Sequence, residues 1–191
     1  MDATVRLIKS YLGFNYGIGC VIGLMLFCVY YYLLKREYRG QGESVPKQEI
    51  LCGLILSVYL TVLLGGTLLN RAPGREYTME LVLFWSYHRA IVTRSAALFW
   101  QIVYNVIVFI PWGILFSVKW PRMKNIRWIA GSAMIFSFLI EVAQLVFKLG
   151  LFEFDDVFHN TLGALIGYGI WRGGELWKNR RKDASLRRHG S

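Results

Sequence analysis

Acidic and amide side chains occur inside or directly beside apolar runs of this chain. Glu141 and Gln144 lie within one such run, and a short acidic connector ends in Asp155 and Asp156. Asn160 follows just as the chain becomes apolar again. A carboxylate within a membrane costs about 2.5–3.5 kcal/mol on insertion scales, so residues of this kind usually mark a functional site or are paired.

Paired carboxylates suit either acid–base catalysis or the binding of a hard cation. Glu141 could act as a general base or metal ligand, with Asp155 and Asp156 as its partners. Alternatively, Glu141 is a structural hydrogen-bond hub with Gln144 or Asn105, and the two aspartates only cap the helix that follows, because anions favour a helix N-terminus. No nucleophile elbow or HExxH signature is present, which favours a non-enzymatic role.

Cysteine and histidine give no sign of a metal or cofactor. Cys20, Cys28 and Cys52 lie within apolar runs, with no paired spacing and no histidine cluster nearby. The sequence therefore predicts no disulfide, no metal site and no cofactor. His159 follows Asp156 by three residues and is either a ligand or proton carrier, or an incidental interfacial residue.

The elements that position these residues are membrane helices. Hydrophobic residues make up 55% of the chain and occur in long blocks. Blocks of about 20 residues match the roughly 30 Å hydrocarbon core of a bilayer. We predict an all-α, polytopic transmembrane helix bundle that forms a single domain over residues 1–191. The expected spans are 14–34, 50–69, 98–118, 128–149 and 157–177, followed by a basic cytoplasmic tail, 178–191.

Three details modify these spans. Gly65-Gly66, near the end of the second span, favour close helix contact or a local break, and Pro111 marks a kink site in the third. The continuously apolar part of the fifth run covers only residues 161–171, so it spans only if the polar residues on either side lie at the two interfaces.

The long connection at residues 70–97 is too polar to span and too apolar to be a solvated loop. A short interfacial or re-entrant helix starting at Thr78, with Glu80 near its N-terminus, reconciles the two. Arg71 and Arg75 stand at i, i+4 spacing; they could bind a phosphate or carboxylate at the mouth of a pocket, or only extend to the interface.

Basic residues set the orientation. Seven of the 22 Lys and Arg fall on one side of the predicted membrane and fifteen on the other. Because cytoplasmic loops collect Lys and Arg, we predict the N-terminus outside and the C-terminus in the cytoplasm. The net charge of +10 is then explained by contact with anionic lipid, so nucleic-acid binding is not expected.

This topology brings the polar residues to one depth. At about 1.5 Å per helical residue, Asn105, Glu141 and Asn160 all lie roughly 5–12 Å below the outer ends of their helices. Helical spacing puts three polar pairs each on one helix face: Gln101 with Asn105, Glu141 with Gln144, and Asp156 with Asn160. Gly163 and Gly167 continue the last stripe as a ridge that admits a neighbouring helix. We predict an outward-opening polar pocket.

These residues carry a resemblance to the VanZ-like membrane proteins. Glu141–Gln144, Phe154–Val157 and Asn160–Tyr168 are similar to the family's IExxQ and DxxxNTLGAxxGY signature, and Asn105–Gly113 is similar to its N-x-x-x-F-x-P-x-G segment. The similarity covers residues 60–172. It implies a role at the cell surface in lowering susceptibility to teicoplanin and related glycopeptide antibiotics.

The chain departs from the family beside the acidic connector. A basic residue often found there is replaced by Leu151 or Phe152. The contact that this basic residue makes in other members would then be made here by another cation: Arg71, Arg75 or Lys148.

Three functions fit this sequence. The first is a non-enzymatic protein of the bacterial cell membrane whose pocket binds an amphiphilic ligand, such as a lipid-linked cell-wall precursor or a lipoglycopeptide, among the membrane lipids. The second is an intramembrane carboxylate-dependent enzyme acting on an envelope substrate. The third is a proton-coupled transporter in which Glu141 carries the proton.

Overall fold

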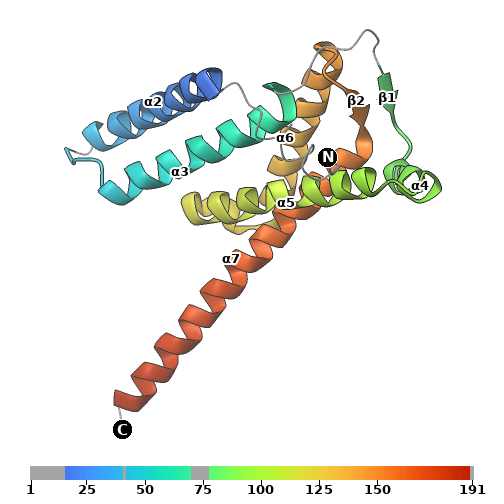
Figure 1. Ribbon diagram of the computed structural model, residues 1–191. Helices are drawn as coiled ribbons and strands as arrows, with labels where there is room; N and C mark the ends of the chain where they lie inside the picture. Colours follow the sequence, from blue (N-terminus) through green and yellow to red (C-terminus); the bar gives the residue numbers. More distant parts are fainter. Residues whose placement is uncertain (1–15, 41, 70–77, 190–191) are drawn as a thin grey trace. The chain divides into compact units, whose positions relative to one another are not determined.

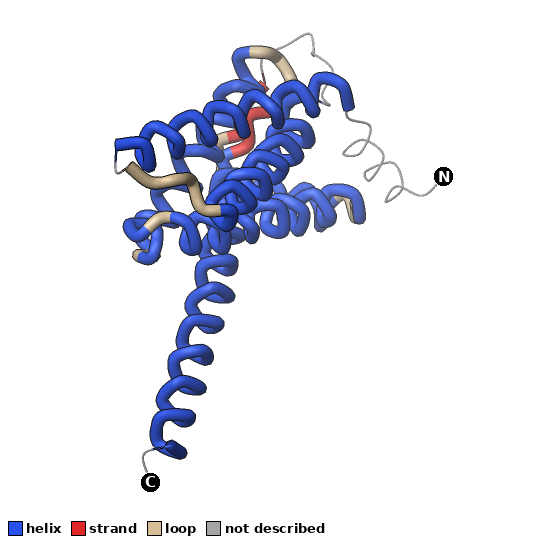
Figure 2. The backbone as a smooth tube through the Cα atoms, turned by 90° about the vertical axis from the view of Figure 1, so that its left-hand side faces the viewer, coloured by secondary structure: helices blue, strands red, loops and turns tan. Residues whose placement is uncertain are grey.

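The computed structural model describes residues 16–40, 42–69 and 78–189. These residues are mostly helical, with two very short strands and short loops between the helices, as the colours of Figure 2 show. They form two compact units, one built from the chain up to Met79 with Val142–Phe152, the other from Glu80–Glu141 with the chain from Glu153 onward. The predicted all-α fold class is confirmed, and the single domain stays a prediction.

Unit 1 is built on a helical hairpin. Helix α2 (Tyr16–Gly40) packs against α3 (Lys47–Leu64), and the two lie side by side in Figure 1. The last turn continues as a π-helix, η1 (Gly65–Leu69). The local break favoured by Gly65-Gly66 is therefore present, because the chain changes at Gly65 from α-helical to wider π-helical hydrogen bonding.

Unit 2 contains the remaining helices. They are α4 (Trp85–Val92), α5 (Ala96–Lys119), the 3₁₀ turn η2 (Pro121–Lys124), α6 (Ile126–Val146, in this unit as far as Glu141) and α7 (Phe154–His189). Its core includes the fully buried apolar side chains of Phe109, Ile129, Ala133 and Ala164 beside several buried polar ones. The Trp112 indole nitrogen donates to Ser132 Oγ at 3.1 Å, which joins α5 to α6.

Helices α5 and α7 approach each other at backbone distance. A Cβ added at Gly163 would lie 2.0 Å from the carbonyl oxygen of Val106, and one added at Gly167 would lie 2.0 Å from that of Ile110. No side chain fits at either position. The predicted glycine ridge is confirmed, and α5 is the helix that it admits.

The connection before α5 differs from its predicted form. Residues Thr78–Glu80 form a strand, β1, which pairs with β2 (Leu151–Glu153), and the short helix begins only at Trp85. The predicted helix start at Thr78 is therefore wrong, because this segment pairs with a strand. The Glu80 side chain instead accepts a hydrogen bond from the nitrogen of Val82 at 3.0 Å, within the turn that follows.

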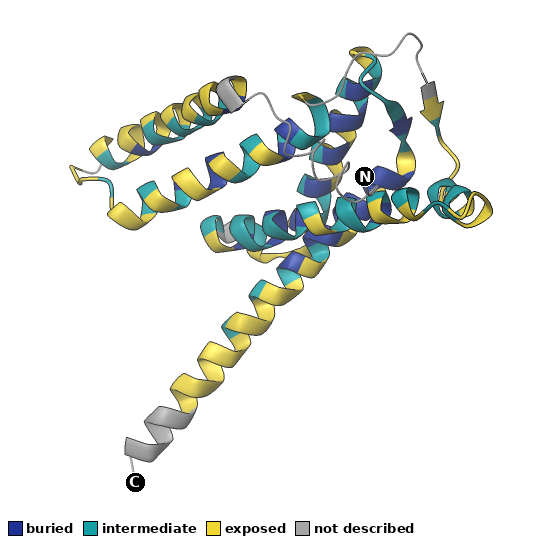
Figure 3. Cartoon of the chain, in the orientation of Figure 1, coloured by how far each residue is buried: buried dark blue, intermediate teal, exposed yellow. Residues whose placement is uncertain are grey.

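Four helices are long and apolar enough to cross a membrane: Ile18–Gly40, Lys47–Leu69, Ala96–Lys119 and Ile126–Val146. They correspond to the first four predicted spans. Pro111 lies within α5 without ending it. The fifth predicted span lies in α7, which is not among the four, so its passage through the membrane stays a prediction. Figure 3 shows that most of the second half of α7 is exposed, as far as its burial is described.

Candidate functional site

Asp155 is a buried carboxylate in the first turn of α7, with a relative exposure of only 3%. It accepts hydrogen bonds from the backbone nitrogens of Phe84 and Ser86, the latter at 2.9 Å, and from the Ser86 hydroxyl. These groups form the start of α4. Asp155 thus lies in the first turn of its own helix, as one reading of the sequence expected, and in addition it caps the start of α4.

The capped segment needs this support. Phe84 precedes α4 with φ of 66°, in the left-handed region, and its side chain supplies no cap. That conformation costs a residue with a Cβ roughly 1–2 kcal/mol. The Asp155 carboxylate offsets this cost by satisfying backbone donors that the first turn of a helix leaves without partners.

His159 lies one turn after Asp155 on α7 and is fully buried. Its Nε2 is 2.9 Å from the Tyr87 hydroxyl on α4, and the two rings meet edge to face. Burial, with a smaller contribution from the Asp155 charge, raises the pKa of Tyr87, which keeps the phenol protonated. Asp155 and His159 together form the surface of α7 on which α4 rests.

Glu153 links the acidic connector to two other elements. Its backbone nitrogen donates to Glu141 Oε2 on α6 at 3.0 Å, and its carboxylate pairs with Arg89 on α4 at 3.7 Å. Glu141 is almost completely buried, at 1% exposure. Arg89 is therefore a cation at the acidic connector. The sequence analysis did not single it out, although its place in the long connection before α5 could have suggested a contact with the acidic connector.

Asp156 is buried in the first turn of α7. It lines a small recess of about 10 Å³ with Ser86, Arg89, Gln101 and Glu153. This volume is about that needed by one water molecule. Gln101 of α5 and Asp156 of α7 therefore line the same recess.

Asn160 joins α7 to α6. Its Nδ2 donates to Ser137 Oγ at 2.7 Å, and both residues are buried. Three buried side-chain atoms of unit 2 have no hydrogen-bond partner within the described chain: Asn105 Nδ2, His159 Nδ1 and Asn160 Oδ1.

The other predicted site residues are placed differently. Gln144 belongs to unit 1, where its Nε2 donates to the carbonyl oxygen of Thr67 in η1 at 3.0 Å. Arg71 and Arg75 lie outside the described residues. Within the part of the chain that the structure describes, no group of three or more His, Cys, Asp and Glu could hold a metal ion.

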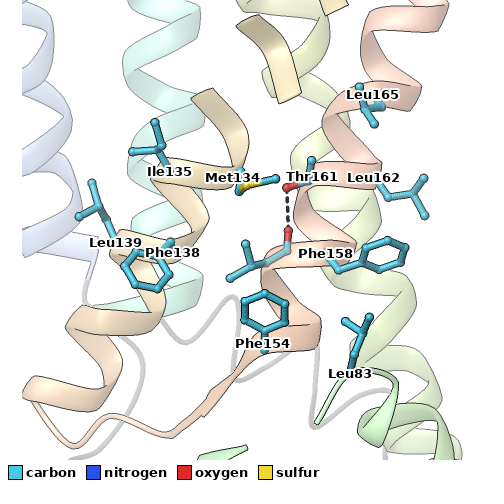
Figure 4. Close-up of a pocket in the computed structure, with 11 residues that line it drawn as sticks. Leu83, Met134, Ile135, Phe138, Leu139, Phe154, Phe158, Thr161, Leu162 and Leu165 are labelled. Carbon is cyan, nitrogen blue, oxygen red and sulfur yellow. Dashed lines mark hydrogen bonds between the residues drawn. The ribbon is translucent and has the colours of Figure 1, made fainter. Parts of the chain in front are cut away.

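An apolar groove with a volume of about 460 Å³ is lined mainly by residues of α6 and α7. Figure 4 shows it running along both helices, with Leu83 and Phe154 at one end and Leu165 at the other. The Thr161 hydroxyl is bonded to its own helix at the Val157 oxygen, at 2.7 Å, so it adds no polarity. The lining residues are Leu83, Met134, Ile135, Phe138, Leu139, Phe154, Val157, Phe158, Thr161, Leu162 and Leu165.

Sequence reasoning missed this groove because it followed the polar residues. A signal was present in the apolar spacing Phe154, Phe158, Leu162 and Leu165, which forms one stripe of a helix. Such a stripe is equally typical of ordinary helix packing, and only the structure shows that it borders a hollow.

Comparison with known proteins gives one family. The model of the VanZ/LLP1 family matches residues 24–178, which covers most of the chain and both units. Protein VanZ from Enterococcus faecium is 25% identical over 127 residues, which is 64% of this chain and 74% of that protein. No solved structure matches. With its apolar helices and its buried Glu141, Asp155 and Asn160 in the expected motifs, this chain is a membrane protein that belongs to the VanZ/LLP1 family.

Proposed function

We propose that this protein lowers the susceptibility of a bacterial cell to teicoplanin and other lipoglycopeptides by binding the acyl chain of an amphiphilic envelope ligand. The ligand is the antibiotic itself or a lipid-linked cell-wall precursor. The family and the similarity to Protein VanZ support the biological setting. The apolar groove between α6 and α7 supports the binding mode.

The groove is the observation that carries the proposal. Its volume of about 460 Å³ falls within the roughly 300–1,000 Å³ of small-molecule sites. Its lining offers aliphatic and aromatic side chains and no free polar group, which suits a hydrocarbon chain. Each CH₂ group buried from water contributes about 0.8 kcal/mol, so an acyl chain that leaves an aqueous or interfacial position gains affinity with length.

The buried polar residues support the walls of this groove. Asn160 binds Ser137, which ties together the two helices that line it. Glu141 binds the backbone of Glu153, directly before α7. In this proposal the polar signature of the family holds α6 and α7 at the separation that the groove requires.

The charge bias supports an orientation with the N-terminus outside and the C-terminus in the cytoplasm. In that orientation the Phe154 end of the groove lies toward the outer surface, where a lipoglycopeptide arrives. The polar head of the ligand would then remain at the surface while its chain enters between α6 and α7.

Filling the groove tests the proposal. Met134→Trp places a larger ring in the groove, and Ile107→Trp is the matched control, because Ile107 is similarly exposed but lies on α5 outside the groove. Both variants are expressed in a susceptible bacterium, and the inhibitory concentration of teicoplanin is measured beside that of a glycopeptide without an acyl chain.

We expect Met134→Trp to abolish protection against teicoplanin and Ile107→Trp to retain it. Neither variant should alter susceptibility to the antibiotic without an acyl chain. Full protection by Met134→Trp at wild-type expression would refute the groove as the binding site.

A further inference from the structure

We propose that a water molecule bound between Asn105 on α5 and Asn160 on α7 joins these two helices, and that it exchanges with the surroundings through the small recess beside Asp156. The inference goes beyond the proposed function, because it concerns the contact between α5 and α7 and needs no amphiphilic ligand. It gives the asparagines of two separate sequence motifs one shared partner.

The two asparagines lie at the same level of the contact between α5 and α7. Toward the start of both helices, Ile102 and Asp156 line the same recess. Farther along both helices, a Cβ added at Gly163 would lie 3.1 Å from the Cβ of Phe109. The asparagines stand between these contacts, four residues before Phe109 and four residues after Asp156. Because residues four apart share one helix face, the two amides face each other.

Each amide has a buried atom that needs a partner, and the two atoms are complementary. Asn105 Nδ2 and Asn160 Oδ1 make no hydrogen bond within the described chain. The first atom only donates and the second only accepts. Asn160 Nδ2 already donates to Ser137 on α6 at 2.7 Å, so the oxygen is the end of this amide that remains for α5. One water molecule that accepts from Asn105 and donates to Asn160 satisfies both atoms.

The recess supplies the route to this site. Side chains on a helix tilt toward its N-terminus, so both amides lean toward the end of the contact at which the recess lies. The recess has a volume of about 10 Å³, which is about that needed by one water molecule. Its polar lining residues are Ser86, Arg89, Gln101, Glu153 and Asp156.

The opposite end of the site is closed by the glycines of α7. A Cβ added at Gly163 or Gly167 would lie 2.0 Å from a carbonyl oxygen of α5, which leaves no space for a water molecule between the two helices there. The water site is therefore blind. It does not supply the path across the membrane that the transporter hypothesis requires.

Radiolytic labelling tests the site, because X-ray pulses convert bound water into hydroxyl radicals that attach oxygen to the nearest side chains. The full-length protein in phosphatidylglycerol nanodiscs is irradiated in water enriched in heavy oxygen, and labelling is mapped by mass spectrometry. Each residue is compared with the same residue in the unfolded protein. Phe109 and Ile129 are both 0% exposed, but only Phe109 lies next to the proposed site.

We expect Ile102 and Phe109 to gain heavy oxygen and Ile129 to gain none. Labelling of Ile102 without Phe109 would place water in the recess alone and overturn the site between the asparagines. Absence of labelling at both residues would overturn the site together with its route of exchange.

A variant tests the part played by Asn105. Asn105→Leu removes the donor and places an apolar side chain of similar size in the contact, so labelling of Phe109 should fall to the level of Ile129. Asn179→Leu makes the same change at an exposed position of α7 and should leave the labelling unchanged. Undiminished labelling of Phe109 in folded Asn105→Leu would overturn the proposal. If this variant fails to fold, the labelling pattern of the wild-type protein still decides.

Discussion

Buried polar side chains in this protein join segments that are far apart in sequence. Asp155 binds residues 84 and 86, Asn160 binds Ser137, and Glu141 binds the nitrogen of Glu153. Removing one partner would leave the other buried and unsatisfied, which costs about 1–3 kcal/mol. The effect of replacing one of these residues on the free energy of unfolding therefore depends on which hydrogen bond the new side chain can still form.

Replacement of Glu141 separates a structural role from a chemical one. Glu141→Gln keeps an oxygen that accepts from Glu153, so we expect wild-type teicoplanin protection and little change in thermal stability. Glu141→Leu removes the acceptor and should destabilise the protein by about 1–3 kcal/mol. Antibiotic susceptibility and unfolding in detergent are measured for both.

The enzyme and transporter hypotheses predict the opposite result, a loss of protection, for Glu141→Gln. Both require Glu141 to gain and lose a proton or bind a metal ion, which Gln cannot do. A stable Glu141→Gln protein without protection would therefore contradict the acyl-binding proposal in its non-enzymatic form.

Gln144 offers a similar test in unit 1. Its amide nitrogen donates to the Thr67 oxygen, and Gln144→Glu would set a carboxylate against that carbonyl. We expect a loss of about 1–3 kcal/mol in stability, measured by thermal unfolding in detergent. Gln48→Glu, at an exposed position of α3, is the control and should be close to neutral. Equal stability of the two variants would show that the Thr67 bond contributes little.

At the scale of elements, apolar runs predict long helices well because a span of fixed length is required by the bilayer. The third span was expected at 98–118 and is found at Ala96–Lys119. The first was expected to end at Leu34, but α2 continues to Gly40 because Lys and Arg end a membrane crossing without ending a helix. The glycine ridge of α7 was also predictable from its four-residue spacing.

Elements stabilised by distant residues were not predictable. Helix α4 starts at Trp85 because Asp155 binds its first turn, and Thr78–Glu80 is a strand because β2 lies beside it. Neither partner is adjacent in sequence. The partners of Glu141, Gln144 and Asn160 escaped prediction for the same reason, although the burial of these residues was expected.

The contact between α5 and α7 gives a test at this scale. Gly167→Ala would place a methyl group 2.0 Å from the Ile110 oxygen, so the helices must separate. We expect Gly167→Ala to lower the free energy of unfolding by about 1–3 kcal/mol, as at other overpacked sites. Gly169→Ala on the same helix meets nothing within 4 Å and should be neutral or slightly stabilising. Thermal unfolding of both variants measures the difference, and equal stability would argue against close packing of α5 on α7.

At the scale of the whole molecule, the predicted membrane orientation is open to a direct test. Ser44→Cys lies in the connector after α2 and Thr93→Cys in the turn after α4, and both positions are exposed. In a chain without the native cysteines, a membrane-impermeant maleimide added to intact cells should label Thr93→Cys only. Labelling of Ser44→Cys instead would reverse the orientation.

The hydrogen bonds between Asp155 and the start of α4 also bear on how the chain is made. Phe84 and its acceptor are separated by 71 residues, and α5 and α6 lie between them in the sequence. A ribosome therefore finishes α4 long before it adds the residue that caps it. Until α7 is made, the nascent chain lacks the acceptor of the Phe84 and Ser86 nitrogens, and a chain truncated before α7 would lack it permanently.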